Sequence, residues 1–169
     1  MSTGGLVNRI RKVETADDVE SLVSVVNQAF LTVADEFGFS ASNAPTFPAF
    51  IEKSVIDKQR ERGLRLYGYW ADGVLIGCIG TRDTGEGGVF LIERLAVLPE
   101  YRHRNIGSRL MEFALDKIVE EHGKTAVVEI VDNNEQLKSW YQKQGFVERR
   151  IDHYAHLPFE VSVLEKNIE

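Results

Sequence analysis

The stretch that decides the fold is residues 90–115, FLIERLAVLPEYRHRNIGSRLMEFAL. It begins in an apolar run, residues 89–98, that only Glu93 and Arg94 interrupt. Pro99 stops this run, which predicts a buried strand because proline cannot donate to a β-ladder. Apolar residues then recur three and four positions apart, which predicts a helix: Ile106, Leu110, Phe113, Ala114 and Ile118.

The segment between this strand and this helix, residues 102–108 (RHRNIGS), predicts an anion site. It opens into a helix N-terminus, where backbone N–H groups lack intrahelical partners and the helix dipole is positive. Arg102, His103 and Arg104 add side chains that can carry positive charge. We expect a phosphate-bearing ligand here, and the alternative for the same residues is a solvated charged turn.

Composition limits the class of protein. With 169 residues, 43% hydrophobic and 27% charged, we expect one domain over residues 1–169 with a sizeable core. The formal net charge of −6 argues against a nucleic-acid partner held by bulk electrostatics. A single cysteine, Cys78, and four scattered histidines predict neither a disulfide nor a metal site, and Cys78 is expected in the core. The absence of a long apolar segment or signal-peptide pattern predicts a cytoplasmic protein without a membrane partner.

The first third of the chain predicts one strand and two helices. Thr15 and Asp18 have the spacing of a capping box at a helix N-terminus. Residues 31–44 show no usable periodicity, and a loop of that length is usually functional or mobile. The expected elements are a strand over residues 6–13, a helix from Thr15 to about Phe30, a loop over 31–44, and a helix that starts between Pro45 and Pro48 and ends near Gly63.

The remaining elements predict a mixed sheet. Asp72-Gly73 indicates a hairpin, and the central strand–helix–strand crossover makes two parallel strands. The resulting fold class is α/β, with a mostly antiparallel sheet, helices on both faces and one parallel pair. The expected elements are strands over residues 65–70, 74–81, 124–131, 146–152 and 159–165, and a helix over 134–144.

Two segments resemble motifs of the GNAT superfamily of N-acetyltransferases. Residues 95–110, LAVLPEYRHRNIGSRL, resemble the acetyl-CoA-binding motif (Arg/Gln)-x-x-Gly-x-(Gly/Ala). Residues 133–146, NNEQLKSWYQKQGF, resemble the second motif, in which Asn134 is followed seven residues later by Tyr141 and then by Gly-Phe. Asn105 stands where glycine is usual, and we expect it in left-handed backbone, which asparagine tolerates best after glycine.

The resemblance implies transfer of acetyl from acetyl-CoA, without a metal, to a small-molecule amine or a peptide amine. The co-substrate would lie between two splayed parallel strands that end near Val97 and Val131. The main chain of the first strand would bind the pantetheine arm through the hydrogen bonds that it would make to an added β-strand. The 102–108 segment would bind the pyrophosphate. Asn134 would bond the pantetheine, cap the following helix, or both. The implied binding residues are Leu95, Ala96, Val97, Arg102, His103, Arg104, Asn105, Ile106, Gly107, Ser108 and Asn134.

The implied chemistry needs an acid and a base. Tyr141 matches the family's general acid near the coenzyme sulfur, and the alternative is a ring that packs beside Trp140. Because a protonated amine cannot attack a thioester, a base must accept its proton directly or through water. Glu93 and Glu129 each sit between apolar neighbours, where desolvation raises a carboxyl pKa, and we slightly favour Glu93. The alternative for either is an acid on a solvated face.

Two other classes of function fit parts of the sequence. One is a non-catalytic domain that binds or senses acyl-CoA and has lost turnover. The other is a mononucleotide-binding protein, which lacks support because no lysine followed by serine or threonine stands in the 102–108 segment. The same fold can act on many different amines, so the sequence does not identify the acceptor amine. The sequence also does not decide whether the protein forms a homodimer.

Overall fold

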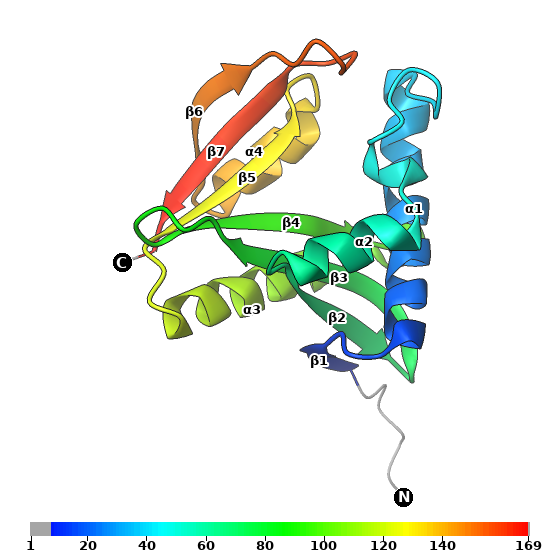
Figure 1. Ribbon diagram of the computed structural model, residues 1–169, viewed down its shortest axis with the longest axis vertical. Coiled ribbons are helices and arrows are strands. Elements are labelled where there is room, and N and C mark those ends of the chain that lie inside the picture. The colour runs from blue at the N-terminus through cyan, green and yellow to red at the C-terminus, as the bar shows by residue number, and fades with distance from the viewer. Residues whose placement is uncertain (1–7, 169) are drawn as a thin grey trace, which may run out of the picture.

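The computed structural model describes residues 8–168, and its centre is a seven-stranded sheet in the order β1-β2-β3-β4-β5-β7-β6 (Figure 1). The strands are β1 Asn8–Lys12, β2 Arg65–Ala71, β3 Val74–Asp83, β4 Val89–Val97, β5 Thr125–Val131, β6 Val147–Asp152 and β7 Val161–Asn167. Only β4 and β5 pair in parallel within the described residues. The predicted fold class is therefore confirmed, while Leu6 and Val7 of the predicted first strand lie outside the described residues.

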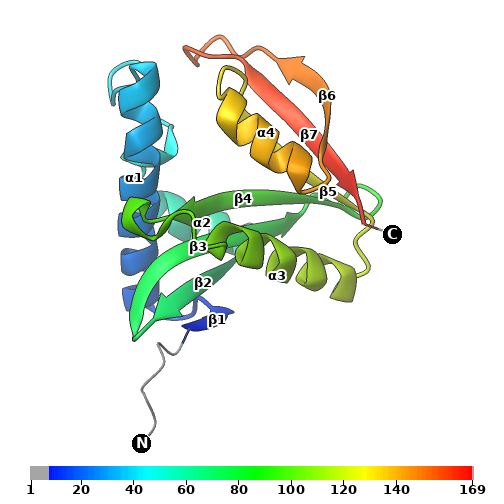
Figure 2. The same ribbon diagram turned by 180° about the vertical axis from the view of Figure 1, so that it is seen from behind.

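Helices cover both faces of the sheet (Figures 1 and 2). Helices α1 and α2 pack on one face, and α3 and α4 pack on the other, so that one large core forms around the strands. A smaller apolar cluster contains Ala34, Ala44, Phe47 and Val131. The helices are α1 Ala16–Phe37, α2 Lys53–Glu61, α3 Ile106–Glu120 and α4 Glu135–Lys143, with short 3-10 helices at Pro48–Phe50 and Pro99–Tyr101.

Helix α1 starts as predicted but runs further than predicted. The Thr15 hydroxyl accepts from the Asp18 N–H at 3.0 Å, and the Asp18 carboxylate accepts from the Thr15 N–H at 3.3 Å. The predicted loop over 31–44 is wrong for its first half, because the helix continues to Phe37 and ends at Gly38 in left-handed backbone. Ala34 is buried and carries the apolar spacing of the helix past Phe30, so packing there extends the helix.

The second helix begins later than predicted. Pro48 starts a three-residue 3-10 helix, and α2 itself begins only at Lys53. Phe47 and Ile51 are buried outside α2, where they fill the space between α1 and the sheet instead of forming a helical stripe. The segment after residue 44 therefore packs against α1 as a short irregular connection.

The parallel pair opens along its length. Strand β4 pairs with β5 only from Val89 to Leu91, and no later pair joins the two strands in residues 8–168. A β-bulge in β4 accompanies the divergence: the register with β3 shifts, and Arg94 has left-handed backbone with φ 58°. Cys78 is fully buried beside it and donates through Sγ to the Arg94 carbonyl at 3.2 Å, which confirms the expectation that Cys78 belongs to the core.

Candidate active site

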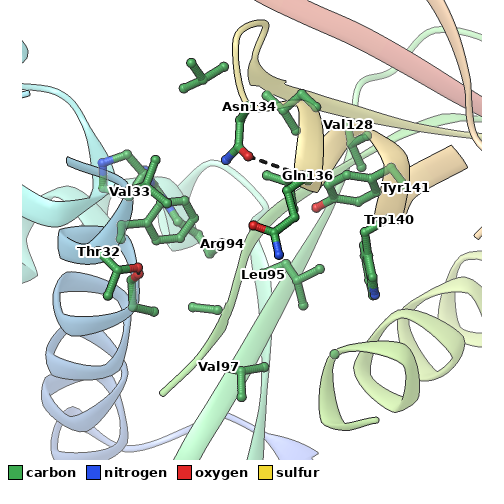
Figure 3. Close-up of a pocket in the computed structure, with 18 of the residues that line it drawn as sticks. Thr32, Val33, Arg94, Leu95, Val97, Val128, Asn134, Gln136, Trp140 and Tyr141 are labelled. Carbon is green, nitrogen blue, oxygen red and sulfur yellow. Dashed lines mark hydrogen bonds between the residues drawn. The ribbon is translucent and has the colours of Figure 1, made fainter. Parts of the chain in front are cut away.

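A cleft of about 730 Å³ opens where β4 and β5 diverge (Figure 3). Its walls come from α1, the bulged half of β4, the N-terminus of α3, the end of β5, α4 and the connection between β6 and β7. Of the predicted site residues, Arg104 is the one that does not line it. The cleft brings the others together: Glu93, Leu95, Ala96, Val97, Arg102, His103, Asn105, Ile106, Gly107, Ser108, Glu129, Asn134 and Tyr141.

The α3 loop, residues 102–105, leads into α3 through two residues in left-handed backbone. His103 has φ 63° and Asn105 has φ 62° and ψ 15°, so the left-handed conformation predicted for Asn105 is confirmed. No side chain caps the α3 N-terminus, and the amides of Ile106, Gly107 and Ser108 have no acceptors within the helix. This geometry leaves backbone donors and the positive helix end for an anionic ligand.

The two arginines of the α3 loop differ in their surroundings. Arg102 reaches α1, where its guanidinium donates to the Ala29 carbonyl at 2.8 Å and to Thr32 Oγ1 at 3.1 Å. Burial lowers the Arg102 pKa from its usual value, but an arginine remains charged. Arg104 is exposed, and its guanidinium lies 5.3 Å from the centre of the Tyr101 ring. Arg102 therefore fixes the α3 loop against α1, and Arg104 faces solvent.

The edge of β4 that faces the opening offers main-chain groups. Because no β5 residue pairs with β4 beyond Leu91, the stretch from Leu95 to Val97 borders the cleft instead of a neighbouring strand. Asn134 lines the same cleft and accepts the Leu137 N–H at 3.2 Å, which confirms its predicted role as the cap of α4. An extended ligand can add to such an edge as a strand does.

Tyr141 is buried on α4, and its hydroxyl points into the cleft beside Gln136 (Figure 3). Its ring makes edge contacts with Trp140 and Phe146, at centroid distances of 5.0 and 5.5 Å. Burial raises the pKa of the Tyr141 phenol well above its ordinary value, so the group is protonated at every physiological pH. Tyr141 therefore combines both predicted features, a packed ring and a donor directed at the cleft.

Glu93 and Glu129 both line the cleft, but they differ in their partners. The Glu93 carboxylate lies 3.8 Å from the Arg82 guanidinium. Glu129 is exposed at the cleft mouth and has no ion pair within residues 8–168. Partial desolvation raises the Glu129 pKa, and the nearby negative charge of Glu93 raises it further. The charges of Arg150 and Arg82 oppose this rise only in part, so the Glu129 pKa stays above its ordinary value, which suits a carboxyl that accepts a proton.

Some cleft residues were not predicted from the sequence. Gln136 lies at the centre of the cleft in Figure 3, one helical turn before Trp140 and Tyr141. A side chain on Gly107 would begin 3.5 Å from the Trp140 ring, so this ring flanks the α3 N-terminus. Arg94 also lines the cleft. Its signal in the sequence, a cation within an otherwise apolar strand, does not show which way the side chain faces.

The part of the chain that the structure describes contains neither a metal-binding cluster nor a membrane-spanning helix. No cluster of three or more His, Cys, Asp or Glu side chains is placed to hold a metal ion in residues 8–168. No helix in the same range combines the length and the apolar character needed to cross a bilayer.

Residues 29–146 match the sequence model of the acetyltransferase (GNAT) family. This range covers more than half of the chain and contains the α3 loop, both glutamates and Tyr141.

Solved structures show the same fold at low sequence identity. The PaiA N-acetyltransferase of Thermoplasma acidophilum, in complex with coenzyme A, matches with TM-score 0.74 and 20% identity over 96% of this chain and 99% of that one. The ribosomal-protein-S18-alanine N-acetyltransferase of Escherichia coli matches with TM-score 0.76 and 16% identity over 96% and 95%. An aminoglycoside 6'-N-acetyltransferase complexed with coenzyme A matches with TM-score 0.70 and 14% identity over 95% and 97%.

Proposed function

Because the chain belongs to the acetyltransferase (GNAT) family, we propose that it moves acetyl from acetyl-CoA to a primary amine by direct attack. The observation that carries the proposal is a single cleft that joins the α3 N-terminus to Tyr141 and two carboxylates. Two of the similar structures contain coenzyme A, which supports acetyl-CoA as the co-substrate. Its thioester would supply an activated acetyl group.

The cleft has suitable groups for the pyrophosphate and for the pantetheine arm of coenzyme A. The uncapped amides of Ile106, Gly107 and Ser108 would bind the pyrophosphate, with Arg104 adding charge from the loop. The β4 edge from Leu95 to Val97 would hold the pantetheine amides, with Asn134 across the cleft. Arg102 would act less directly, because its guanidinium already bonds α1 and holds the loop in place.

In the proposed reaction Glu129 accepts a proton from the incoming ammonium, directly or through water. Its raised pKa makes it a better base than an ordinary surface glutamate, and its exposure allows the proton to pass to solvent. Glu93 would keep the Glu129 pKa raised through its own charge, and it is the second candidate for the base. The neutral amine then forms the N–C bond as the C–S bond breaks, and the nitrogen passes its surplus proton to the coenzyme A thiolate, directly or through water.

Tyr141 would stabilise the sulfur of coenzyme A as it leaves. Its phenol is protonated and points into the cleft, so it can donate a hydrogen bond to the sulfur as negative charge develops there. An unperturbed tyrosine, with a pKa of about 10, is already a weaker acid than a thiol such as that of cysteine, at about 8.5, and burial raises the Tyr141 pKa further. Full proton transfer from the phenol is therefore uphill, and stabilisation of the developing charge is its main contribution.

The experiment combines a binding and a turnover measurement. Calorimetry should show acetyl-CoA binding, and thiol release should rise when a panel of primary amines is added with acetyl-CoA. Tyr141→Phe should retain binding and lose turnover. Binding without amine-dependent thiol release would contradict the proposed reaction and favour the non-catalytic acyl-CoA-binding domain instead.

A further inference from the structure

Arg94 is a cation in the cleft wall that makes no ion pair with any of the residues 8–168. Its guanidinium makes one hydrogen bond in residues 8–168, from Nη2 to Gln59 Oε1 at 3.1 Å, and Gln59 is neutral. The Nε atom is buried and has no hydrogen-bond partner in the same range. No carboxylate there lies within ion-pair distance of Arg94. Burial lowers the Arg94 pKa, and the negative charge of neighbouring Glu93 offsets this only in part. A partly desolvated charge without a direct ion pair is costly, so Arg94 is held in an unfavourable environment.

The backbone at Arg94 is also unfavourable. Arg94 occupies left-handed backbone at the β4 bulge, a region that a long side chain rarely adopts. The bulge brings Arg94 to the cleft on the same stretch of β4 as Glu93. Strain of this kind is retained mostly where it positions a functional group. Figure 3 shows Arg94 on the α1 side of the cleft, with Tyr141 on the opposite side.

The charges around the cleft indicate what the missing partner is. Arg82 pairs with Glu93, and Arg150 pairs with Asp152. Four cleft-lining charges then make no ion pair in residues 8–168: Arg94, Arg102, Glu36 and Glu129. Arg102 is held by the Ala29 carbonyl and Thr32, and Glu36 is exposed on α1. Arg94 and Glu129 are the two of opposite sign that flank the diverging strands β4 and β5. A ligand with one ammonium and one carboxylate complements both charges. A polyamine would instead bring additional positive charge towards Arg94.

We infer that the acceptor is an amino acid whose carboxylate binds Arg94 while its amine faces Glu129. A guanidinium matches a carboxylate geometrically and can donate two parallel hydrogen bonds to it. Phe47 and Pro48 also line the cleft, and an apolar lining strengthens an ion pair that forms within it. The inference rests on the proposed function and narrows its acceptor class.

The experiment compares each of the common L-amino acids with its amide, which keeps the side chain and removes the carboxylate. The amide is the better nucleophile at neutral pH because its amine is less basic, so a preference for the acid requires recognition by the protein. We expect kcat/KM from thiol release to be at least 10-fold higher for the preferred amino acid than for its amide. Arg94→Gln should remove this preference, with acetyl-CoA affinity unchanged by calorimetry.

Two further variants control for folding and for loss of charge. Arg94→Lys keeps the charge without the planar fork, and it should retain part of the preference. Arg65→Gln makes the same chemical change at a β2 arginine that pairs with Glu121 and does not line the cleft, and it should keep the full preference. If Arg94→Gln lowers the melting temperature sharply, Arg94→Lys decides the result, and equal preference in wild type and Arg94→Lys would overturn the inference.

A binding measurement separates this inference from the proposed function. Calorimetry with coenzyme A present should detect the amino acid with wild-type protein, and the signal should be lost with Arg94→Gln. Arg94-dependent binding without turnover would overturn the proposed reaction and keep Arg94 as the carboxylate site. Turnover that is equal for acids and amides, or reduced equally for both by Arg94→Gln, would overturn the inference and leave the proposed function standing.

Discussion

The Arg102 guanidinium donates to the Ala29 carbonyl at 2.8 Å, across 73 residues of sequence. This bond ties the α3 loop to α1, and a second bond to Thr32 reinforces it. The α3 loop is therefore held in place before any ligand binds. Its two arginines should consequently respond differently to mutation.

We expect Arg102→Ala to lower the free energy of unfolding by about 1–2 kcal/mol, because two bonds from a charged group are lost. Acetyl-CoA affinity should fall with it, since the loop loses its attachment to α1. Arg104→Ala should leave stability unchanged and raise the acetyl-CoA Kd about five-fold, roughly 1 kcal/mol for an exposed charge. Chemical denaturation and calorimetry at two salt concentrations would check both.

The double variant should bind acetyl-CoA more weakly than either single variant, with a shallower dependence on salt. Unchanged affinity in the double variant would contradict the assignment of the α3 loop to the phosphates.

Asn105 should tolerate glycine and reject β-branched residues. Its backbone is left-handed, so Asn105→Gly should leave acetyl-CoA affinity nearly intact, whereas Asn105→Val should cost about 1 kcal/mol or more. Thermal unfolding and calorimetry on the two variants would measure the difference. Equal behaviour of the valine and glycine variants would mean that the loop relaxes into another conformation.

Local signals in the sequence predicted most of the fold. The capping box of Thr15 and Asp18, the Asp72-Gly73 hairpin and the strand–turn–helix around Pro99 all depend on residues within a few positions of one another. The extension of α1 to Phe37 was missed because it depends on burial of Ala34 by a segment ten or more residues further on. Propensity alone does not contain that information.

The candidate site was likewise predicted where the signal is local and missed where it depends on distant segments. The motif residues of β4, α3 and α4 were predicted, and all but Arg104 line one cleft. The partner of Arg102 could not be predicted, because Thr32 lay in a segment expected to be a loop. Arg94 was missed for a related reason. Its exposure to the cleft follows from the shifted register between β3 and β4, which is a property of strand pairing and not of either strand alone.

Glu129 should make the protein less stable as pH rises. A folded-state pKa above the unfolded value means that the folded state binds more protons, so the free energy of unfolding falls between the two pKa values. Glu129→Gln should therefore be more stable than wild type at neutral pH and equal to it below about pH 4, the ordinary range of glutamate. Denaturant unfolding at several pH values would measure this, and a lower stability of the variant at neutral pH would contradict it.

The pH dependence of turnover should separate the two glutamates. Glu129→Gln should remove the low-pH ionisation from the kcat/KM profile and leave activity mainly at high pH, where the amine arrives neutral. Glu93→Gln should instead shift that ionisation to lower pH, because the negative charge that raises the Glu129 pKa is gone. The reverse pattern would assign the base to Glu93, and two normal profiles would place the base outside both residues.

Tyr141→Phe tests the donor to the leaving sulfur, because it keeps the ring that packs on Trp140 and Phe146 and removes only the hydroxyl. Acetyl-CoA affinity should survive, while kcat falls. A lost general acid typically costs about 10²–10⁴-fold. We expect the lower end of this range, since the raised pKa of Tyr141 limits its contribution to hydrogen bonding and a thiolate leaves readily.

Tyr67→Phe is the matched control, because Tyr67 is a similarly buried tyrosine that packs on Phe113 and does not line the cleft. It should keep wild-type turnover. Single-turnover measurements would establish that the chemical step limits the rate, so that slower departure of the sulfur lowers kcat. Under that condition, wild-type turnover in Tyr141→Phe would remove the tyrosine from the mechanism. An equal loss in both tyrosine variants would attribute the effect to packing, because the Tyr141 hydroxyl points into the cleft (Figure 3) whereas Tyr67 does not line it.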